Sequence, residues 1–252
     1  MPKPIIYATD PESLTRDGLT ETVAVWEDGL RADTGSGSFE WWYFDAHLDD
    51  GSTAVIVFAT KSILERNSSL RPGLSLTITR PDGVKLAQFP QFPPEVFTAS
   101  KESCDVRIGP SWVRGDLHRY ELHAEVEGLA ADLTFTGSVP PWRPGAGKAG
   151  FGDIDHYFAW LPAIPYGTVT GTLTYEGQTV PVTGTGYHDH NWGNVGLHTV
   201  MDHWYWGHAH LGDYSLIFVE QIAAKAYGSQ KLPVFMLAKG DRILTGDGGP
   251  LR

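Results

Sequence analysis

The stretch FEWWYFDAHLDDGSTAVIVFAT, residues 39–60, predicts how this chain folds. An aromatic and apolar run ends at Asp49-Asp50-Gly51, and a β-branched apolar run, 52–60, follows it directly. This pattern is typical of a β-hairpin, because glycine readily adopts the positive φ that tight turns require. We therefore expect two antiparallel strands joined by this turn.

The same arrangement of strand and turn recurs along the chain. Further alternating or β-branched runs lie at 74–79, 111–114, 120–126, 131–137, 168–175 and 178–183. No window of 12 residues shows the apolar period of a helix. Short strands with frequent turns predict an all-β barrel or sandwich. The proline-rich segments 140–145 and 162–167 are expected to be irregular crossings between strands.

Composition narrows the class of protein and its partners. The chain has 252 residues and a formal net charge of -11, without runs of Lys or Arg, which argues against nucleic acid or an anionic membrane surface as partner. The longest apolar run, 54–59, is far shorter than the roughly 20 residues that span a bilayer, so we expect no membrane insertion. One cysteine, Cys104, and an N-terminus without the apolar core of a signal peptide predict a cytoplasmic protein.

An internal similarity indicates two related β units. Residues 40–52 and 203–215 share Trp, Ala, His, Leu, Asp and Ser at equivalent positions. We expect an irregular lead-in at 1–37, a β domain at 38–198 and an incomplete second unit at 199–252. Because an unpaired apolar edge strand promotes association, the last strands should complete the first sheet or pair with another subunit in a homo-oligomer.

Candidate chemistry is concentrated between 184 and 210, where six of the ten histidines lie among aromatic rings. Such a mixture is typical of a cavity wall at which a few polar groups surround an apolar ligand. As a strand, 187–192 would place Tyr187, Asp189 and Asn191 on one face and the two histidines and Trp192 on the other. An aspartate among aromatic rings has a raised pKa and can donate a proton near neutral pH. The alternative is that Asp189 and Asn191 are turn residues that bond local amides.

Other candidate sites have weaker signals. The pairs His188-x-His190 and His208-x-His210 have spacing compatible with zinc or iron, but no spaced cysteines accompany them, and we expect no metal. Asp153, Asp155 and His156 precede the aromatic segment 157–160 and are candidates to enter the cavity from a neighbouring strand. Cys104 has no neighbouring base to activate its thiol, and no glycine-rich segment has Walker spacing.

Three signatures, at 39–44, 186–193 and 204–207, resemble the hydroxyneurosporene synthase family, the carotenoid 1,2-hydratase (CrtC-like, AttH-like) group. The resemblance extends from about residue 36 to the C-terminus. It implies tandem lipocalin-like (calycin) β-barrel units, with the second one incomplete here, and a ligand pocket at or near their junction. Hydratases of this group add water to an isolated double bond without a cofactor, and other members look like cyclases or epoxide-opening enzymes.

In the hydratases an aspartate acts as the acid, with a tyrosine two residues before it and a tryptophan upstream. The resemblance therefore implies Asp189 as acid, with Tyr187 and Trp160 beside it. We expect a cofactor-independent enzyme that protonates a hydrophobic isoprenoid or polyketide-derived molecule and so hydrates, cyclises or rearranges it. The expected binding residues are Trp41, Tyr43, Tyr157, Asn191, Trp192, Trp204, Trp206 and His208. A carrier of hydrophobic ligands and a His-ligated metal enzyme are the alternatives.

Overall fold

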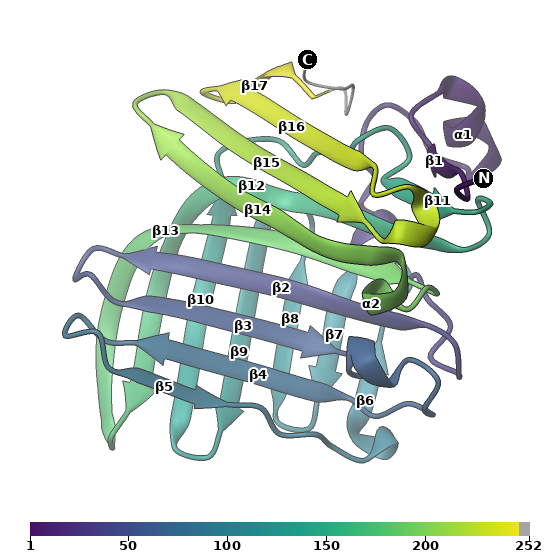
Figure 1. Cartoon of the computed structure of the whole chain (residues 1–252). Helices are drawn as coiled ribbons and strands as arrows, with labels where there is room; N and C mark the ends of the chain where they lie inside the picture. Colours follow the sequence, from purple (N-terminus) through teal and green to yellow (C-terminus); the bar gives the residue numbers. More distant parts are fainter. Residues whose placement is uncertain (247–252) are drawn as a thin grey trace.

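A computed structural model describes residues 1–246, and it is built almost entirely of antiparallel β-strands (Figure 1). The strands are β1 (Ile5–Tyr7), β2 (Phe39–Leu48), β3 (Thr53–Ala59), β4 (Gly73–Thr79), β5 (Lys85–Gln88), β6 (Phe97–Ala99), β7 (Cys104–Ile108), β8 (Ser111–Gly115), β9 (Arg119–Val126), β10 (Leu129–Gly137), β11 (Lys148–Phe151), β12 (Tyr157–Tyr175), β13 (Gln178–Gly193), β14 (Met201–Leu211), β15 (Tyr214–Ala223), β16 (Lys231–Lys239) and β17 (Arg242–Thr245). The α-helices are α1 (Pro11–Arg16) and α2 (Leu197–Val200), and 3-10 turns lie at Val25–Asp28, Ile63–Glu65, Pro94–Val96 and Lys225–Tyr227. This confirms the predicted all-β class.

The strands form two sheets. Thirteen of them make one large sheet in the order β5-β4-β3-β2-β13-β12-β10-β9-β8-β7-β6, with β11 paired to β12 and β1 paired to β11. This sheet curls, so that β2–β5 face β6–β10 across its interior (Figure 1). A separate sheet, β14-β15-β16-β17, lies over the outer face of the large sheet next to β2, β13 and β12 (Figure 1).

The interior of the curl is a packed apolar core. Along β2 the alternate residues Trp42, Phe44 and Ala46 are fully buried in it, together with the inward residues of β3, β4 and β7–β10. Burying each large apolar side chain contributes about 1.5–3 kcal/mol relative to leaving it exposed. Because side chains alternate across a strand, Trp41 and Tyr43 point to the opposite face, towards the second sheet.

Polar side chains also enter this core, and most of their polar atoms have hydrogen-bond partners; Asp28 Oδ1 and His190 Nδ1, which lie 3.4 Å apart, have none within residues 1–246. The ring nitrogens of His188 lie 2.9 Å from the backbone oxygen of Tyr43 and 3.2 Å from Asp28 Oδ2. The Tyr120 hydroxyl donates to the same Asp28 oxygen at 2.5 Å. His190 Nε2 lies 2.7 Å from Glu40 Oε1. Buried polar groups are tolerated where they are hydrogen-bonded in this way.

Strand β12 differs from the expectation that 162–167 forms an irregular crossing. This segment lies inside β12, with register shifts against β13 between Pro162 and Ile164 and between Ile164 and Gly167. On its opposite edge, β12 pairs with β11 from Tyr157 to Ala159 and with β10 from Gly167 onwards. Residues 160–166 therefore have no ladder partner on that edge among the described strands. The prolines therefore occupy a stretch whose second edge needs no ladder hydrogen bonds, which is where a strand tolerates proline.

The ends of the chain are organised around these sheets. Within the expected lead-in, β1 pairs with β11 and so extends the large sheet. The last strands form their own sheet rather than completing the first one. Within residues 1–246, β14 is paired on one side, with β15, and its Trp204, Tyr205 and Leu211 are exposed. No helix of this part of the chain is both long and apolar enough to cross a membrane.

Candidate active site

A mainly apolar pocket of about 250 Å³ lies between the outer face of the large sheet and the second sheet. The large sheet contributes Trp41, Tyr43, Phe158, Trp160, Asp189 and Asn191. The opposite wall and one end are formed by Ile63, Leu197, Met201, Trp204, Trp206, Val219 and Gln221. Apolar walls with a few convergent polar groups are typical of small-molecule sites.

Asp189 is the buried carboxyl group of this pocket, with 6% of its surface exposed. Its Oδ2 accepts hydrogen bonds from Trp160 Nε1 at 2.7 Å and from the Tyr187 hydroxyl at 2.8 Å. Its Oδ1 accepts from Asn191 Nδ2 at 2.6 Å. Tyr187, Asp189 and Asn191 share a face because they alternate along β13, and the pairing of Trp160 with Asn191 brings β12 to the same place.

Two opposing effects set the proton affinity of this group. Burial raises the pKa of the Asp189 carboxyl, because the charged form loses its hydration. The donors Trp160, Tyr187 and Asn191, and the nearby His188, lower the pKa, but burial outweighs them. A carboxyl has about four lone-pair positions, and three donors point at this one. The remaining position is where Asp189 can carry an acidic proton.

Tyr187 stays a hydrogen-bond donor in this setting. Burial and the neighbouring Asp189 raise the pKa of its phenol well above the ordinary value, so the hydroxyl keeps its proton. Its ring stacks on His208 with centroids 4.7 Å apart and lies 5.3 Å from the ring of Trp206. The ring of Tyr43 approaches it edge-on at 6.3 Å. The electron-rich faces of such rings can stabilise a nearby cation.

The structure brings most of the expected site residues together. Asp189, Trp160, Trp41, Tyr43, Asn191, Trp204 and Trp206 line the pocket, and Tyr187 supports Asp189 from behind. Three expected binding residues lie elsewhere. Trp192 points into the packed core, Tyr157 borders a different hollow with Lys148 over its ring, and His208 bonds to Asp45 on the far side of Tyr187. Trp192 and Tyr157 have the wrong strand parity for the pocket, because they alternate with Asn191 on β13 and with Phe158 on β12. His208 shares the parity of Trp204 and Trp206, so its displacement does not follow from strand alternation.

Sequence reasoning missed six pocket residues, namely Ile63, Phe158, Leu197, Met201, Val219 and Gln221. Phe158 could have been predicted from the sequence, because it precedes Trp160 by two positions and therefore shares its face of β12. Ile63 comes from the turn between β3 and β4, and the other four enter from segments whose position depends on how the second sheet lies over the first.

The four histidines of the metal alternative do not converge. His188 and His190 point into the core of the large sheet, where they bond to Asp28 and Glu40. His210 belongs to the second sheet, stacks on Tyr166 with centroids 3.8 Å apart and lies 3.0 Å from the Ser215 hydroxyl. The thickness of a sheet separates the two pairs, so they cannot share one ion.

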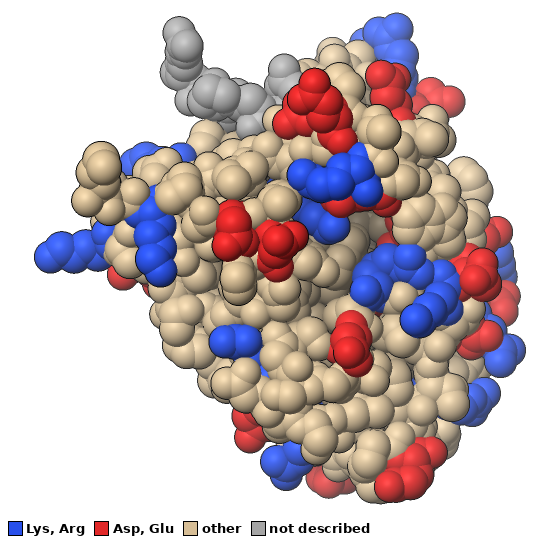
Figure 2. Space-filling model, turned by 90° about the vertical axis from the view of Figure 1, so that its right-hand side faces the viewer, with Lys and Arg blue, Asp and Glu red and all other residues tan. Residues whose placement is uncertain are grey.

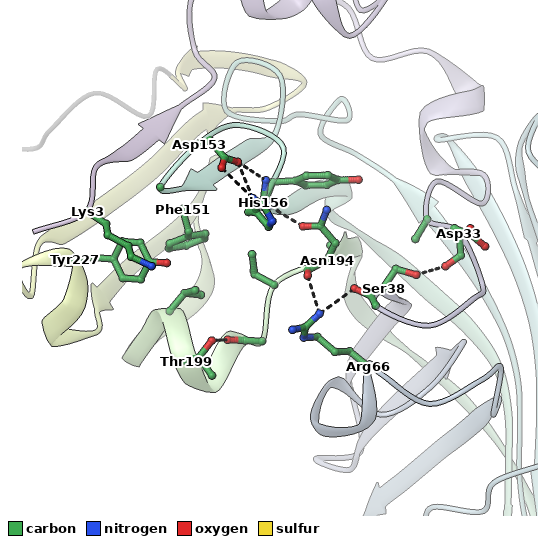
Figure 3. Close-up of a pocket in the computed structure, with 18 of the residues that line it drawn as sticks. Lys3, Asp33, Ser38, Arg66, Phe151, Asp153, His156, Asn194, Thr199 and Tyr227 are labelled. Atoms are coloured by element: carbon green, nitrogen blue, oxygen red, sulfur yellow. Dashed lines mark hydrogen bonds and ion pairs between the residues drawn. The ribbon is translucent and has the colours of Figure 1, made fainter.

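A larger hollow of about 950 Å³ is polar, and acidic and basic side chains surround it (Figure 2). Asp153 and His156 lie here, bonded to each other at 2.8 Å, rather than in the apolar pocket (Figure 3). Arg66 donates to the backbone oxygens of Gly37 and Asn194 at 3.2 and 3.1 Å. The expected entry of Asp153 and His156 into the apolar cavity is therefore not seen.

Parts of the chain match known proteins that are named for two different activities. Over 123 residues the chain is 32% identical to the quinolone epoxide rearrangement protein penF of Penicillium thymicola, a match that covers 45% of this chain and 34% of penF. Over 214 residues it is 25% identical to a hydroxyneurosporene dehydrogenase of Chlorobaculum tepidum, covering 68% of the chain and 53% of that protein. The matched parts thus span about a third to a half of these relatives.

The fold has counterparts among solved structures. A putative AttH from Nitrosomonas europaea superposes with a TM-score of 0.62 at 19% identity, covering 88% of this chain and 75% of the other. This likeness concerns the fold, and it confirms the predicted lipocalin-like class. Residues 27–240, which include most of both sheets and all the residues that line the pocket, match a family described as Domain of unknown function (DUF7064). The chain belongs to this family.

Proposed function

We propose that this chain carries the acid site of a cofactor-independent enzyme that hydrates, cyclises or rearranges a hydrophobic secondary metabolite. The observation that carries the proposal is the Asp189 carboxyl, buried in an aromatic pocket with three hydrogen-bond donors around it. The name of penF, a quinolone epoxide rearrangement protein, favours an epoxide or a related strained ether as the reacting group.

In the first step Asp189 transfers its proton to the ligand. With an epoxide, the oxygen takes the proton and a C–O bond breaks, which leaves a carbocation. With an alkene, the π electrons form a new C–H bond and the other carbon becomes the cation. The raised pKa of Asp189 means that the group can hold a proton closer to neutral pH than an exposed aspartate does.

The aromatic walls then protect the cation. Trp41, Tyr43, Trp160 and Trp206 surround the pocket, and ring faces attract positive charge by about 0.5–2 kcal/mol each. Few polar groups line the pocket, which keeps bulk water from trapping the cation indiscriminately.

The second step quenches the cation and restores the acid. A single water, or a hydroxyl group of the ligand itself, forms a C–O bond to the cationic carbon and gives its proton to the Asp189 carboxylate. Asn191 lies beside Asp189 in the wall and is placed to orient that nucleophile. Hydration results when water is the nucleophile, and cyclisation or rearrangement when it is internal. No redox partner is needed in either case.

The test replaces Asp189 by Asn, with the exposed Asp132→Asn as matched control. The amide keeps the shape and can accept from Trp160 and Tyr187, but it has no acidic proton. Purified proteins are incubated with a panel of aryl epoxides and terminal polyenes, and products are followed by mass spectrometry. Binding is measured by quenching of the fluorescence of the pocket tryptophans.

We expect turnover by the wild type and by Asp132→Asn, loss of at least a hundredfold in Asp189→Asn, and binding within a few-fold throughout. Full activity of Asp189→Asn would remove this residue from the mechanism.

The second candidate is a carrier of hydrophobic ligands, which the apolar walls alone would also favour. A carrier has no need of a buried carboxyl with a raised pKa. Tight binding of a panel compound by the wild type, with no product after prolonged incubation, would favour the carrier over the enzyme.

A further inference from the structure

A second group of convergent side chains lies behind Tyr187, outside the pocket. Asp45 and His47 project from the same face of β2, and His208 reaches them from β14. We propose that these three residues bind a divalent transition-metal ion of the zinc type, which cross-links the two sheets. This site is separate from the acid chemistry proposed for Asp189, and it does not depend on it.

The spacing of the three ligand atoms suits such an ion. Asp45 Oδ2 lies 3.0 Å from His208 Nε2, and Asp45 Oδ1 lies 4.0 Å from His47 Nε2. One atom from each residue lies within 4.8 Å of the other two. Tetrahedral zinc with bonds of about 2.0–2.2 Å holds its ligand atoms about 3.3–3.6 Å apart. The His47 side chain, 65% exposed, is free to make the small movement required.

A second and independent observation is the state of the Asp45 carboxylate. Asp45 is 5% exposed, and its Oδ1 has no hydrogen-bond partner. Leaving a buried acceptor unsatisfied is unfavourable, and the cost is greater for a charged group. The same oxygen is the one nearest His47. An ion between these groups would satisfy it, and two neutral imidazoles with one carboxylate are ligands that zinc, nickel and cobalt accept.

The site is also open to an incoming ion. A hollow of about 250 Å³ is lined by Asp45, His47 and His208, next to Tyr43 and Trp206. This leaves a coordination position for water, as open zinc sites have.

Another trio, Asp28, Cys104 and His188, has comparable spacing. It is sealed in the core of the large sheet, where Asp28 Oδ2 already accepts from Tyr120 and faces His188. That trio is a buried hydrogen-bond network with no route for an ion, so it carries no metal proposal.

The ion would act on the geometry of the junction. It would join β2 to the edge strand β14, for which residues 1–246 show no direct backbone pairing with the large sheet. It would also hold the His208 ring that stacks on Tyr187, whose hydroxyl donates to Asp189.

The test measures metal binding to the untagged protein after removal of metals with a chelator. Zinc is titrated by calorimetry, and cobalt by its visible absorption, which is intense for tetrahedral sites. His47→Gln removes one ligand at an exposed position and should not disturb folding, which circular dichroism checks. His118→Gln, at another exposed histidine, is the matched control.

We expect one ion per chain in the wild type and in His118→Gln, at least tenfold weaker binding in His47→Gln, and a zinc-dependent rise of the unfolding temperature in the first two proteins. Less than a tenth of an equivalent bound to the wild type, or equal binding by His47→Gln, would overturn the proposal. These measurements need no substrate, so their failure is distinguishable from failure of the proposed enzymatic activity.

Discussion

Replacing Trp160 by phenylalanine tests whether the indole N–H stabilises the charged form of Asp189. The N–H donates to Asp189 Oδ2 at 2.7 Å, and phenylalanine keeps an aromatic ring but has no donor. Burial of Asp189 is nearly complete, so solvent screens this hydrogen bond little. We expect Trp160→Phe to destabilise the protein more at alkaline than at acidic pH.

The magnitude follows from the charge of the acceptor. A hydrogen bond to a neutral group contributes about 0.5–1.5 kcal/mol, and one to a charged group about 1.5–3 kcal/mol. The pH-dependent part of the loss should therefore be about 0.5–2 kcal/mol, added to a packing loss that is the same at every pH.

The direction follows from linkage. Folding raises the pKa of Asp189 above its unfolded value of about 3.9. The group therefore contributes its full stabilisation at pH values below the unfolded pKa. That stabilisation decreases as the pH rises through the pKa of the folded state. Without the Trp160 donor, the ionised form is stabilised less, and this decrease becomes larger.

The assay compares unfolding free energies from urea titrations at about pH 4 and about pH 8, because burial moves the titration of folded Asp189 upwards from its unfolded value. Trp142→Phe is the matched control, because Trp142 packs edge-on against Trp160 and donates to a neutral acceptor, the backbone oxygen of Gly246, at 3.1 Å. The unfolding free energy that Trp142→Phe loses should therefore not depend on the charge of Asp189. An equal loss for Trp160→Phe at both pH values would refute the reasoning.

Three further predictions concern the large sheet. Phe44→Ala should lower the unfolding free energy by about 3–5 kcal/mol, because Phe44 is fully buried, whereas Phe89→Ala at an exposed site should change it little in the same urea titration. Gly186→Ala should destabilise by about 1–3 kcal/mol, because the new Cβ would lie 2.6 Å from the backbone oxygen of Asp45; a melting temperature equal to that of the wild type would contradict this. Cys104 is buried, and burial raises the pKa of its thiol, so iodoacetamide at neutral pH should label it after denaturation and not before, as mass spectrometry can check.

Much of the site could be anticipated from local pattern. The alternation of a strand places Tyr187, Asp189 and Asn191 on one face, and the structure has this arrangement. Tyr187 and Asn191 each donate a hydrogen bond to the carboxyl of Asp189. The hairpin at 39–60 appears as β2 and β3 with its turn between them.

Other parts could not be anticipated because they depend on contacts distant in sequence. Phe158 could have been assigned by parity, but Leu197, Met201 and Val219 line the pocket because the second sheet lies on the first. Asp28 enters the core from a turn that no strand pattern predicts, and it meets His188 there at 3.2 Å.

The all-β class and the face of β13 on which the candidate acid lies could both be predicted from local pattern, because both follow from a two-residue period along the chain. The residues that complete the site depend instead on how distant strands pair and pack. Trp160 reaches Asp189 through strand pairing across 29 positions, and His208 reaches Asp45 across 163. Register and the packing of one sheet on another are set by the summed contacts of many side chains, so no single stretch of sequence specifies them.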